Sequence, residues 1–219
     1  MAGITNAAFR RLAAEQGAGL YVCEMITSRG LVERQAKTLS MLAFDALETT
    51  RSVQLYGVDP RYVGEAVRIL VGEFGVHHVD FNFGCPVPKI TRKGGGAALP
   101  WKRDLLRAIL AEAVRAASPH GVPVTMKTRM GIDREHLTYL DAGRIAQDAG
   151  CAAIALHART VQQAYSGIAA WERIATLVDA EGAARFRAAY AHGVDHPLVR
   201  RNPDSGRLAL FMAGYWMDH

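Results

Sequence analysis

Short apolar segments alternate with amphipathic segments along most of the chain, and this alternation restricts the fold more than any other feature. Segments rich in Val, Ile and aromatic residues, bounded by Gly or Pro, predict β-strands over residues 19–24, 52–56, 77–83, 122–128 and 152–157. Helices are predicted between them over residues 6–16, 60–74, 101–117 and 135–149. Strands separated by helices form parallel sheets, so the pattern predicts an α/β fold of the TIM (β/α)8 barrel type.

Polar side chains lie at or near the ends of these predicted strands. Gln54 lies in the second segment and Asn82 in the third. The fourth contains Lys127 and leads into Arg129, and the fifth ends at His157. In a (β/α)8 barrel the carboxyl ends of the strands form the mouth, where active sites lie. We therefore expect these side chains to share one site, although Lys127 could instead reach solvent and His157 could be a packed core histidine.

The segment DFNFGCPVPKITRKGGGAAL, residues 80–99, carries the most specific chemistry. Cys85 follows a strand end and precedes Pro86, and proline fixes φ, so the thiol is expected on a defined loop. The alternative is a small buried hydrophobic residue, the usual environment of a free cysteine. Lys89, Arg92 and Lys93 then form a basic loop before three glycines. These cations could contact nucleic-acid phosphates or lie in a solvated loop, while the glycines let the backbone approach a ligand.

Composition excludes several classes of protein. The net charge of +5 is compatible with a polyanionic partner and equally with a solvated basic surface. Three cysteines without CxxC or Cys/His spacing argue against a disulfide framework and against a metal site. No apolar run reaches the roughly 18 residues that a membrane span needs, and the sequence does not open with a signal-peptide pattern. A reducing, cytoplasmic location without membrane association is expected.

Six blocks of sequence together resemble the bacterial type of the tRNA-dihydrouridine synthase family. They are MAGITNAAFRRL, CEMITSRGL, VQLYGVDP, DFNFGCPVPKITRKGGGAAL, PVTMKTRMGID and LHARTVQQAYSG, in the family's order over about residues 1–177. The resemblance implies an FMN-containing TIM barrel followed by a small helical domain, which together bind tRNA. It implies reduction of the C5–C6 double bond of a uridine, with NADPH as the electron source. A dihydroorotate-type dehydrogenase is a weaker match, because it does not explain the Cys-Pro-x-Pro-Lys and RKGGG blocks.

The resemblance also implies a role for each candidate residue. Cys85 matches the family's catalytic cysteine, the proton donor to uridine C5. Positions that contact the flavin are matched by Met1, Ala2, Gln54, Lys127 and His157, and positions near the flavin and substrate by Asn82 and Arg129. The chemistry suits these groups: hydride addition at C6 builds negative charge at C5 and O4, so an acid must supply a proton. A lysine at the N1 edge would stabilise reduced flavin.

The resemblance stops after Leu177. The family continues with two more barrel strands, whose loops commonly hold a phosphate, and then with the helical tRNA-binding domain. Residues 178–219 contain one strand-like run, 208–213, and are too short for all of this. We expect residues 1–177 to form an incomplete FMN-binding barrel with a shortened first strand. The last two βα units are expected to be absent or replaced, residues 178–219 to form an atypical tail, and the helical domain to be absent.

Two explanations of this tail stay open. It could be an out-of-frame product of a frameshift or of a wrongly delimited gene, or it could belong to a genuine shortened relative. The abrupt loss of resemblance favours the first. Two function classes also stay open: a flavoenzyme acting on tRNA, and a truncated, catalytically inactive fragment or RNA-contacting remnant. A complete protein is expected to be a monomer. This chain alone is expected to bind FMN weakly or not at all and to be prone to aggregation.

Overall fold

A parallel sheet forms the centre of the computed structural model, which describes residues 3–17, 19–175, 177, 199–201 and 208–210. Its strands are β1 (Tyr21–Val22), β2 (Ile26–Thr27), β3 (Arg51–Tyr56), β4 (His78–Phe83), β5 (Val124–Arg129) and β6 (Ala153–His157). The order is β1-β3-β4-β5-β6, and β2 also pairs with β3. Because β1 pairs with the start of β3 and β2 with its end, the two are halves of one interrupted strand.

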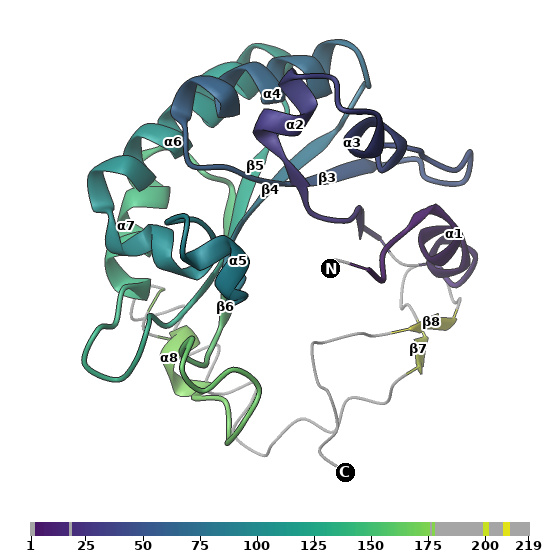
Figure 1. Ribbon diagram of the computed structural model, residues 1–219. Coiled ribbons are helices and arrows are strands. Elements are labelled where there is room, and N and C mark those ends of the chain that lie inside the picture. Colours follow the sequence, from purple (N-terminus) through teal and green to yellow (C-terminus); the bar gives the residue numbers. More distant parts are fainter. Residues whose placement is uncertain (1–2, 18, 176, 178–198, 202–207, 211–219) are drawn as a thin grey trace.

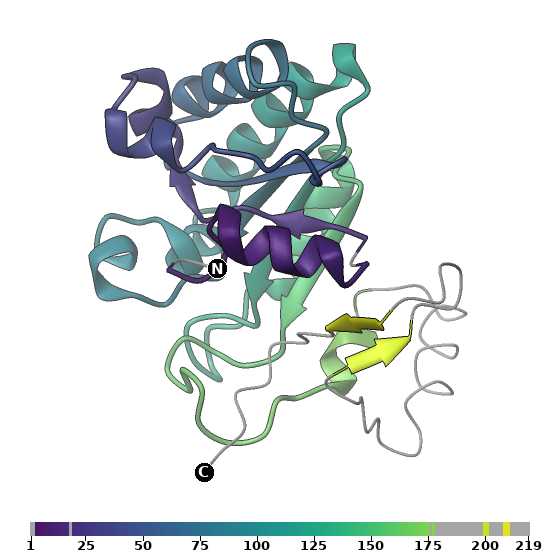
Figure 2. The same ribbon diagram turned by 90° about the vertical axis from the view of Figure 1, so that its right-hand side faces the viewer.

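Helices follow the strands along the outer side of the sheet (Figure 1). They are α2 (Ser28–Val32), α3 (Ala36–Ser40), α4 (Pro60–Gly72), α6 (Arg103–Ala117) and α7 (Tyr139–Asp148). The short elements α5 (Pro88–Thr91), η1 (Gly96–Trp101), η2 (Ser118–His120) and α8 (Glu172–Ala175) lie in connections. The sheet curves as an arc with helices outside, and α1 (Ala7–Glu15) lies beside its open side (Figure 2). This is an incomplete (β/α)8 barrel, as the sequence predicts.

The main core fills the space between the sheet and the outer helices. Leu55, Phe81 and Met126 contribute from β3, β4 and β5, and Leu70 and Leu110 contribute from α4 and α6; all are fully buried. Each such side chain contributes about 1.5–3 kcal/mol by leaving water. The other face of the sheet carries the polar residues, since side chains alternate along a strand. The apolar face therefore fixes the sheet and leaves the inner face free for chemistry.

Most predicted elements are confirmed, and the differences have local causes. The side chain of Asn6 caps α1 by accepting from the Phe9 N–H at 2.9 Å, as predicted. Helix α7 begins at Tyr139 instead of residue 135, because the carboxylate of Asp133 accepts from the backbone N–H groups of Glu135 and His136. These bonds hold a turn where the helix was expected.

A second sheet is a two-stranded antiparallel ribbon of β7 (Val199–Arg201) and β8 (Leu208–Leu210). Arg201 pairs with Leu208, and Val199 pairs with Leu210. The strand-like run expected at 208–213 is thus a strand over 208–210, and residues 211–213 lie outside the described residues. Met1 and Ala2, the two flavin-contacting positions expected at the amino terminus, also lie outside them.

Candidate active site

Strand register brings the predicted site residues into adjacent rows on the inner face of the sheet. Gln54 of β3 pairs with Asp80 of β4, and Asn82 pairs with Lys127 of β5. One step toward the carboxyl ends, Arg129 pairs with His157 of β6. The side chains expected to share one site therefore come from neighbouring strands at one end of the sheet.

Cys85 lies on a loop whose backbone is held from two sides. The Asn82 Oδ1 atom accepts from the Gly84 N–H at 3.1 Å and from the Cys85 N–H at 2.9 Å. On the other side, the Ala97 N–H donates to the Cys85 carbonyl at 3.0 Å. The Cys85 thiol is partly exposed, unlike that of Cys23, which is fully buried. The loop predicted from the flanking proline is thus held by its backbone directly after the carboxyl end of β4, and Cys85 is not among the residues that line the cavity described below.

Gly96 of the glycine run packs directly against this loop. It has a φ of +55°, and a Cβ atom on it would lie 2.5 Å from the Cys85 carbonyl oxygen. Glycine is therefore required here both by its left-handed backbone and by space. We expected these glycines to admit a ligand; the structure shows that Gly96 admits the backbone of the cysteine loop itself.

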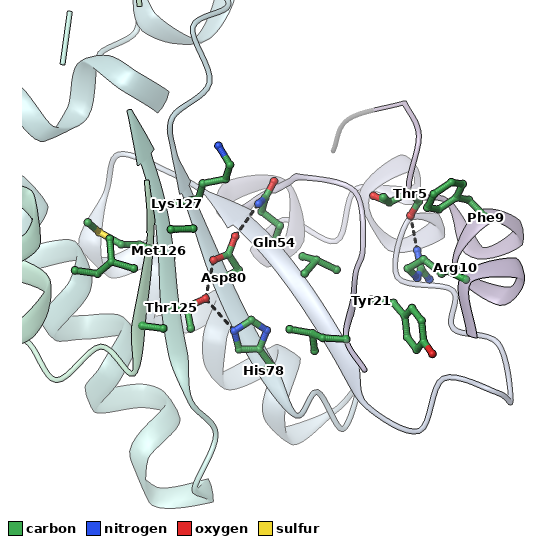
Figure 3. Close-up of a pocket in the computed structure, with 16 residues that line it drawn as sticks. Thr5, Phe9, Arg10, Tyr21, Gln54, His78, Asp80, Thr125, Met126 and Lys127 are labelled. Atoms are coloured by element: carbon green, nitrogen blue, oxygen red, sulfur yellow. Dashed lines mark hydrogen bonds between the residues drawn. The ribbon is translucent and has the colours of Figure 1, made fainter. Parts of the chain in front are cut away.

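A cavity of about 510 Å³ opens along the inner face of the sheet (Figure 3). Gln54, Lys127 and Asp80 line it from the sheet, and Phe9 and Arg10 line it from α1. Gln54 Nε2 donates to Asp80 Oδ2 at 2.7 Å, and Gln54 Oε1 accepts from Asn82 Nδ2 at 3.0 Å. These bonds use one of the two hydrogens on Gln54 Nε2 and one of the two lone pairs on Gln54 Oε1. The Gln54 amide therefore has one donor and one acceptor left for a ligand.

Lys127 brings a cation to the cavity, and none of the described residues forms an ion pair with it. Among the described residues its amine has neither a hydrogen bond nor an ion pair, and Figure 3 shows the amine pointing away from Asp80. Burial lowers the pKa of Lys127, as does nearby Arg129, while Asp80 acts in the opposite direction. A partly buried cation of this kind is stabilised by an anionic or electron-rich ligand.

Arg129 is buried and donates hydrogen bonds to three loop carbonyls. Its guanidinium donates to the carbonyls of Gly84 at 3.0 Å, Thr160 at 3.1 Å and Ala164 at 2.7 Å. It also lies 5.4 Å from the centre of the Tyr165 ring. The backbone on either side of the mouth, after β4 and after β6, is therefore linked through one side chain. The sequence alone indicated a position near flavin and substrate, and these carbonyl contacts were not foreseen.

His157 lies in a strongly cationic environment. Burial lowers its pKa to about 4, and Arg129, Lys127 and Arg159 add to that effect. The imidazole is consequently neutral at neutral pH, and Arg159 Nη1 lies 3.4 Å from its Nε2. Three cations around a neutral imidazole make this end of the sheet attractive to an anion.

The basic loop residues lie outside this cluster. Lys89 is in α5, Arg92 and Lys93 follow it, and all three are exposed. They are accessible to a large partner and do not line the cavity.

Three residues of the inner face were missed by the sequence reading: His78, Asp80 and Thr125. The signal was available in HVDFNF, residues 78–83, where His, Asp and Asn alternate with apolar residues. Period-two polarity on a barrel strand places such residues together on the inner face.

The described part of the chain lacks two kinds of feature, a cluster of metal-binding side chains and a membrane-spanning helix. It contains no cluster of three or more His, Cys, Asp or Glu residues suited to a metal ion. Its helices are all too short or too polar to cross a membrane.

Comparison with known proteins identifies the family of this fold and site. A family model described as dihydrouridine synthase matches residues 1–181. The chain belongs to the dihydrouridine synthase family. The expectation that the resemblance stops after Leu177 stays a prediction, since the alignment to one relative below extends over the whole chain.

Individual relatives agree with this assignment. A protein named probable tRNA-dihydrouridine synthase from Mycobacterium tuberculosis is 56% identical over 184 residues, covering 81% of this chain and 47% of the relative. A protein of the same name from Treponema pallidum is 38% identical over 181 residues, covering 81% and 53%. The tRNA-dihydrouridine synthase B of Vibrio cholerae is 34% identical over 233 residues, covering 100% and 70%. The chain thus spans about half the length of the first two relatives.

Proposed function

We propose that this chain provides flavin-binding side chains of the sheet and the catalytic acid of a tRNA-dihydrouridine synthase. The reaction would reduce the C5–C6 bond of a uridine in tRNA, with FMN as cofactor and NADPH as reductant. The observation that carries the proposal is the loop of Cys85, which is bonded to Asn82 and lies within electrostatic reach of the Lys127 amine, a partly buried group with no ion pair among the described residues. Family membership supports the same reading.

The residues present fit a flavin. The Lys127 amine would lie at the electron-rich N1 edge of the ring, where a cation favours the reduced form. The Gln54 amide can donate to and accept from the ring, and the neutral imidazole of His157 can do either as well. Bound FMN would supply a hydride to C6 of the uridine. Within the family, Met1 and Ala2 correspond to further flavin contacts.

Cys85 would supply the proton that the reduction requires. As hydride reaches C6, negative charge grows at C5 and O4, and the Cys85 S–H would protonate C5. The resulting thiolate would recover a proton from water, which completes the cycle. Asn82 would hold the loop through the Gly84 and Cys85 N–H groups, so the residue that carries the thiol keeps a fixed position after β4. Arg129 supports the loop through the Gly84 carbonyl.

The tRNA would reach this mouth with its target base flipped out. Unstacking a base costs only a few kcal/mol, least where the strand is already single. Lys89, Arg92 and Lys93 would contact phosphates, because they are exposed and follow the cysteine loop closely in the chain. We assign residues 1–177 to the incomplete barrel and 178–219 to a separate tail. The three free cysteines support a reducing, cytoplasmic location, and a monomer is the proposed state of the complete protein.

The decisive experiment measures dihydrouridine formation in tRNA by the 219-residue chain with excess FMN and NADPH. Cys85→Ala should retain flavin binding and lose at least about 100-fold in activity, the scale expected for a missing general acid. Cys151→Ala, which removes a half-buried thiol away from the mouth, is the matched control and should remain active. Equal activity of Cys85→Ala and the unmodified chain would refute the acid role. Absence of activity in the unmodified chain would favour the alternative, an inactive fragment or RNA-contacting remnant.

A further inference from the structure

A continuous chain of hydrogen bonds crosses the inner face of the sheet from its base to the cysteine loop, and Figure 3 shows its central part, from His78 through Thr125 and Asp80 to Gln54. At the base, Ser52 Oγ lies 2.6 Å from His78 Nδ1, and His78 Nε2 lies 2.9 Å from Thr125 Oγ1. The Thr125 hydroxyl donates to Asp80 Oδ1 at 2.6 Å. From the other side, Gln54 donates to Asp80, and Asn82 donates to Gln54. The chain therefore has a lower arm, formed by Ser52, His78 and Thr125, and an upper arm, formed by Gln54 and Asn82. Both arms end at the carboxylate of Asp80.

The carboxylate fixes the direction of the lower arm. A carboxylate only accepts hydrogen bonds, so the single hydroxyl hydrogen of Thr125 must point to Asp80. Thr125 Oγ1 must then accept from His78 Nε2–H. Burial lowers the pKa of His78 below its ordinary value, so the ring is neutral and its Nδ1 lone pair is free to accept from Ser52. One tautomer of His78 satisfies all of these bonds.

The same carboxylate fixes the upper arm. Because Gln54 Nε2 points to Asp80, its Oε1 faces the Nδ2 group of Asn82. Asn82 Oδ1 is thereby left to accept from the backbone of Cys85. A flipped Gln54 amide would set two N–H donors against each other, and flipping Asn82 as well would set a donor against the Cys85 N–H. Only one orientation of the two amides satisfies every group.

We propose that Asp80 is a positioning residue for Cys85, acting by fixing the amide orientations of Gln54 and Asn82. Asp80 does not touch the thiol; it determines which atom of Asn82 faces the cysteine loop. The catalytic meaning of this device rests on the proposed function. The hydrogen-bond relay itself is tested without flavin, reductant or tRNA.

The first experiment measures amide hydrogen exchange by NMR in the 219-residue chain. Asp80→Leu removes both acceptors, and the adjacent cavity has room for the larger side chain. Exchange of the Gly84 and Cys85 amides should accelerate about tenfold, the scale of one hydrogen bond. The Val79 amide, which donates to the Pro123 carbonyl, should keep its protection. Equal acceleration at Val79 would mean that Asp80 merely stabilises the sheet, which would overturn the proposal.

A double-mutant cycle tests whether the effect passes through Asn82. Asn82→Ala alone should accelerate exchange at Cys85 about as much as Asp80→Leu does. Combining the two substitutions should add nothing further, because both remove the same interaction. Additive effects would contradict the relay. If Asp80→Leu does not fold, Gln54→Leu replaces it in the cycle, since it interrupts the same arm.

Asp80→Asn gives a second, independent readout. Its Oδ1 can still accept from Gln54, while its Nδ2 must donate to Thr125 Oγ1. The hydroxyl hydrogen of Thr125 then turns to His78 Nε2, and the ring hydrogen moves to Nδ1, where Ser52 can accept it. Cys85 exchange should stay within about threefold of the unmodified chain, while the ¹⁵N shifts of the His78 ring exchange their pattern. An unchanged His78 tautomer would overturn the proposed direction of the hydrogen bonds.

Discussion

Strands β4 and β6 of the same sheet differ in how completely they are enclosed. His78–Phe83 of β4 pairs with strands on both sides, and five of its six residues are buried. Within the described residues, β6 pairs with β5 alone, and Ala153 and Ala155 are exposed on the side of the cavity. The cysteine loop extends from the enclosed strand, and His157 ends the open one. Side chains on β4 are thus positioned by neighbouring strands, whereas those on β6 depend on a single neighbour.

The largest test of this contrast compares two leucines. Leu55 lies on β3, which like β4 has strands on both sides, and is fully buried, whereas Leu156 of β6 is only partly buried. Leu55→Ala should lower the free energy of unfolding by about 2–5 kcal/mol, through lost burial and the cavity left behind. Leu156→Ala should cost about 1 kcal/mol or less, because its surroundings are already open. Urea denaturation of both variants measures this, and equal losses would show that β6 is as enclosed as β3.

A second test compares a cation on β5, which pairs with β4, with a cation that follows β6. Lys127→Met removes the unpaired amine of β5 and should weaken FMN binding by about 10- to 100-fold, the scale of a hydrogen bond to a charged group. It should also make reduction of the bound flavin less favourable. Arg159→Met is the control after β6: its guanidinium already donates to the Gly167 carbonyl, so about threefold weakening or less is expected. Flavin fluorescence titration measures the FMN affinity of both variants. A larger loss of affinity in Arg159→Met than in Lys127→Met would contradict the prediction.

A third test uses adjacent glycines beside the cysteine loop. Gly96→Ala should destabilise the chain by about 1–2 kcal/mol for the left-handed backbone alone. It should also alter the rate at which Cys85 reacts with a thiol reagent, since the new Cβ would displace the loop. Gly95→Ala has an ordinary φ, and the nearest atoms to its Cβ would be side-chain atoms of Ile90 and Val58 at 3.3 and 3.4 Å, with the Ile90 carbonyl oxygen at an ordinary contact distance of 3.6 Å. The contact at Gly96 would be unimportant if both variants behaved alike.

The smallest predicted effect concerns pH at the open strand. His157 has a pKa near 4 in the folded chain, and histidine has one near 6.5 when unfolded. Between these values the unfolded chain binds a proton that the folded chain does not, so stability falls as pH falls. From pH 7 to pH 6 the contribution is about 0.7 kcal/mol. His157→Gln should reduce this loss in urea denaturation, and an unchanged pH dependence would contradict the assignment.

The sequence predicted the enclosed strands well, because their patterns are long and clearly bounded. Residues 52–56 and 77–83 were expected as strands, and β3 and β4 differ from them by one residue at the start. The short elements α2, α3 and α5 were missed, since four or five residues show no periodicity. Family resemblance identified the cysteine and the flavin-facing positions, whose roles stay predictions.

The interactions that position those residues could not be predicted in the same way. The importance of Asp80 depends on Gln54 and Thr125, which lie 26 and 45 positions away in the chain. Arg129 donates to carbonyl oxygens, which every residue has, so no residue type marks its partners. Such contacts are known only once the strands are placed side by side.

The three carbonyl contacts of Arg129 have a consequence for changes in loop length. Substitutions at Thr160 or Ala164 leave the backbone carbonyls in place, so the loop after β6 tolerates changes of side chain. An insertion or deletion between them would move one carbonyl relative to the other and pull on the guanidinium that also binds Gly84. Grafting a loop of different length into residues 158–167 would therefore shift the cysteine loop that follows β4.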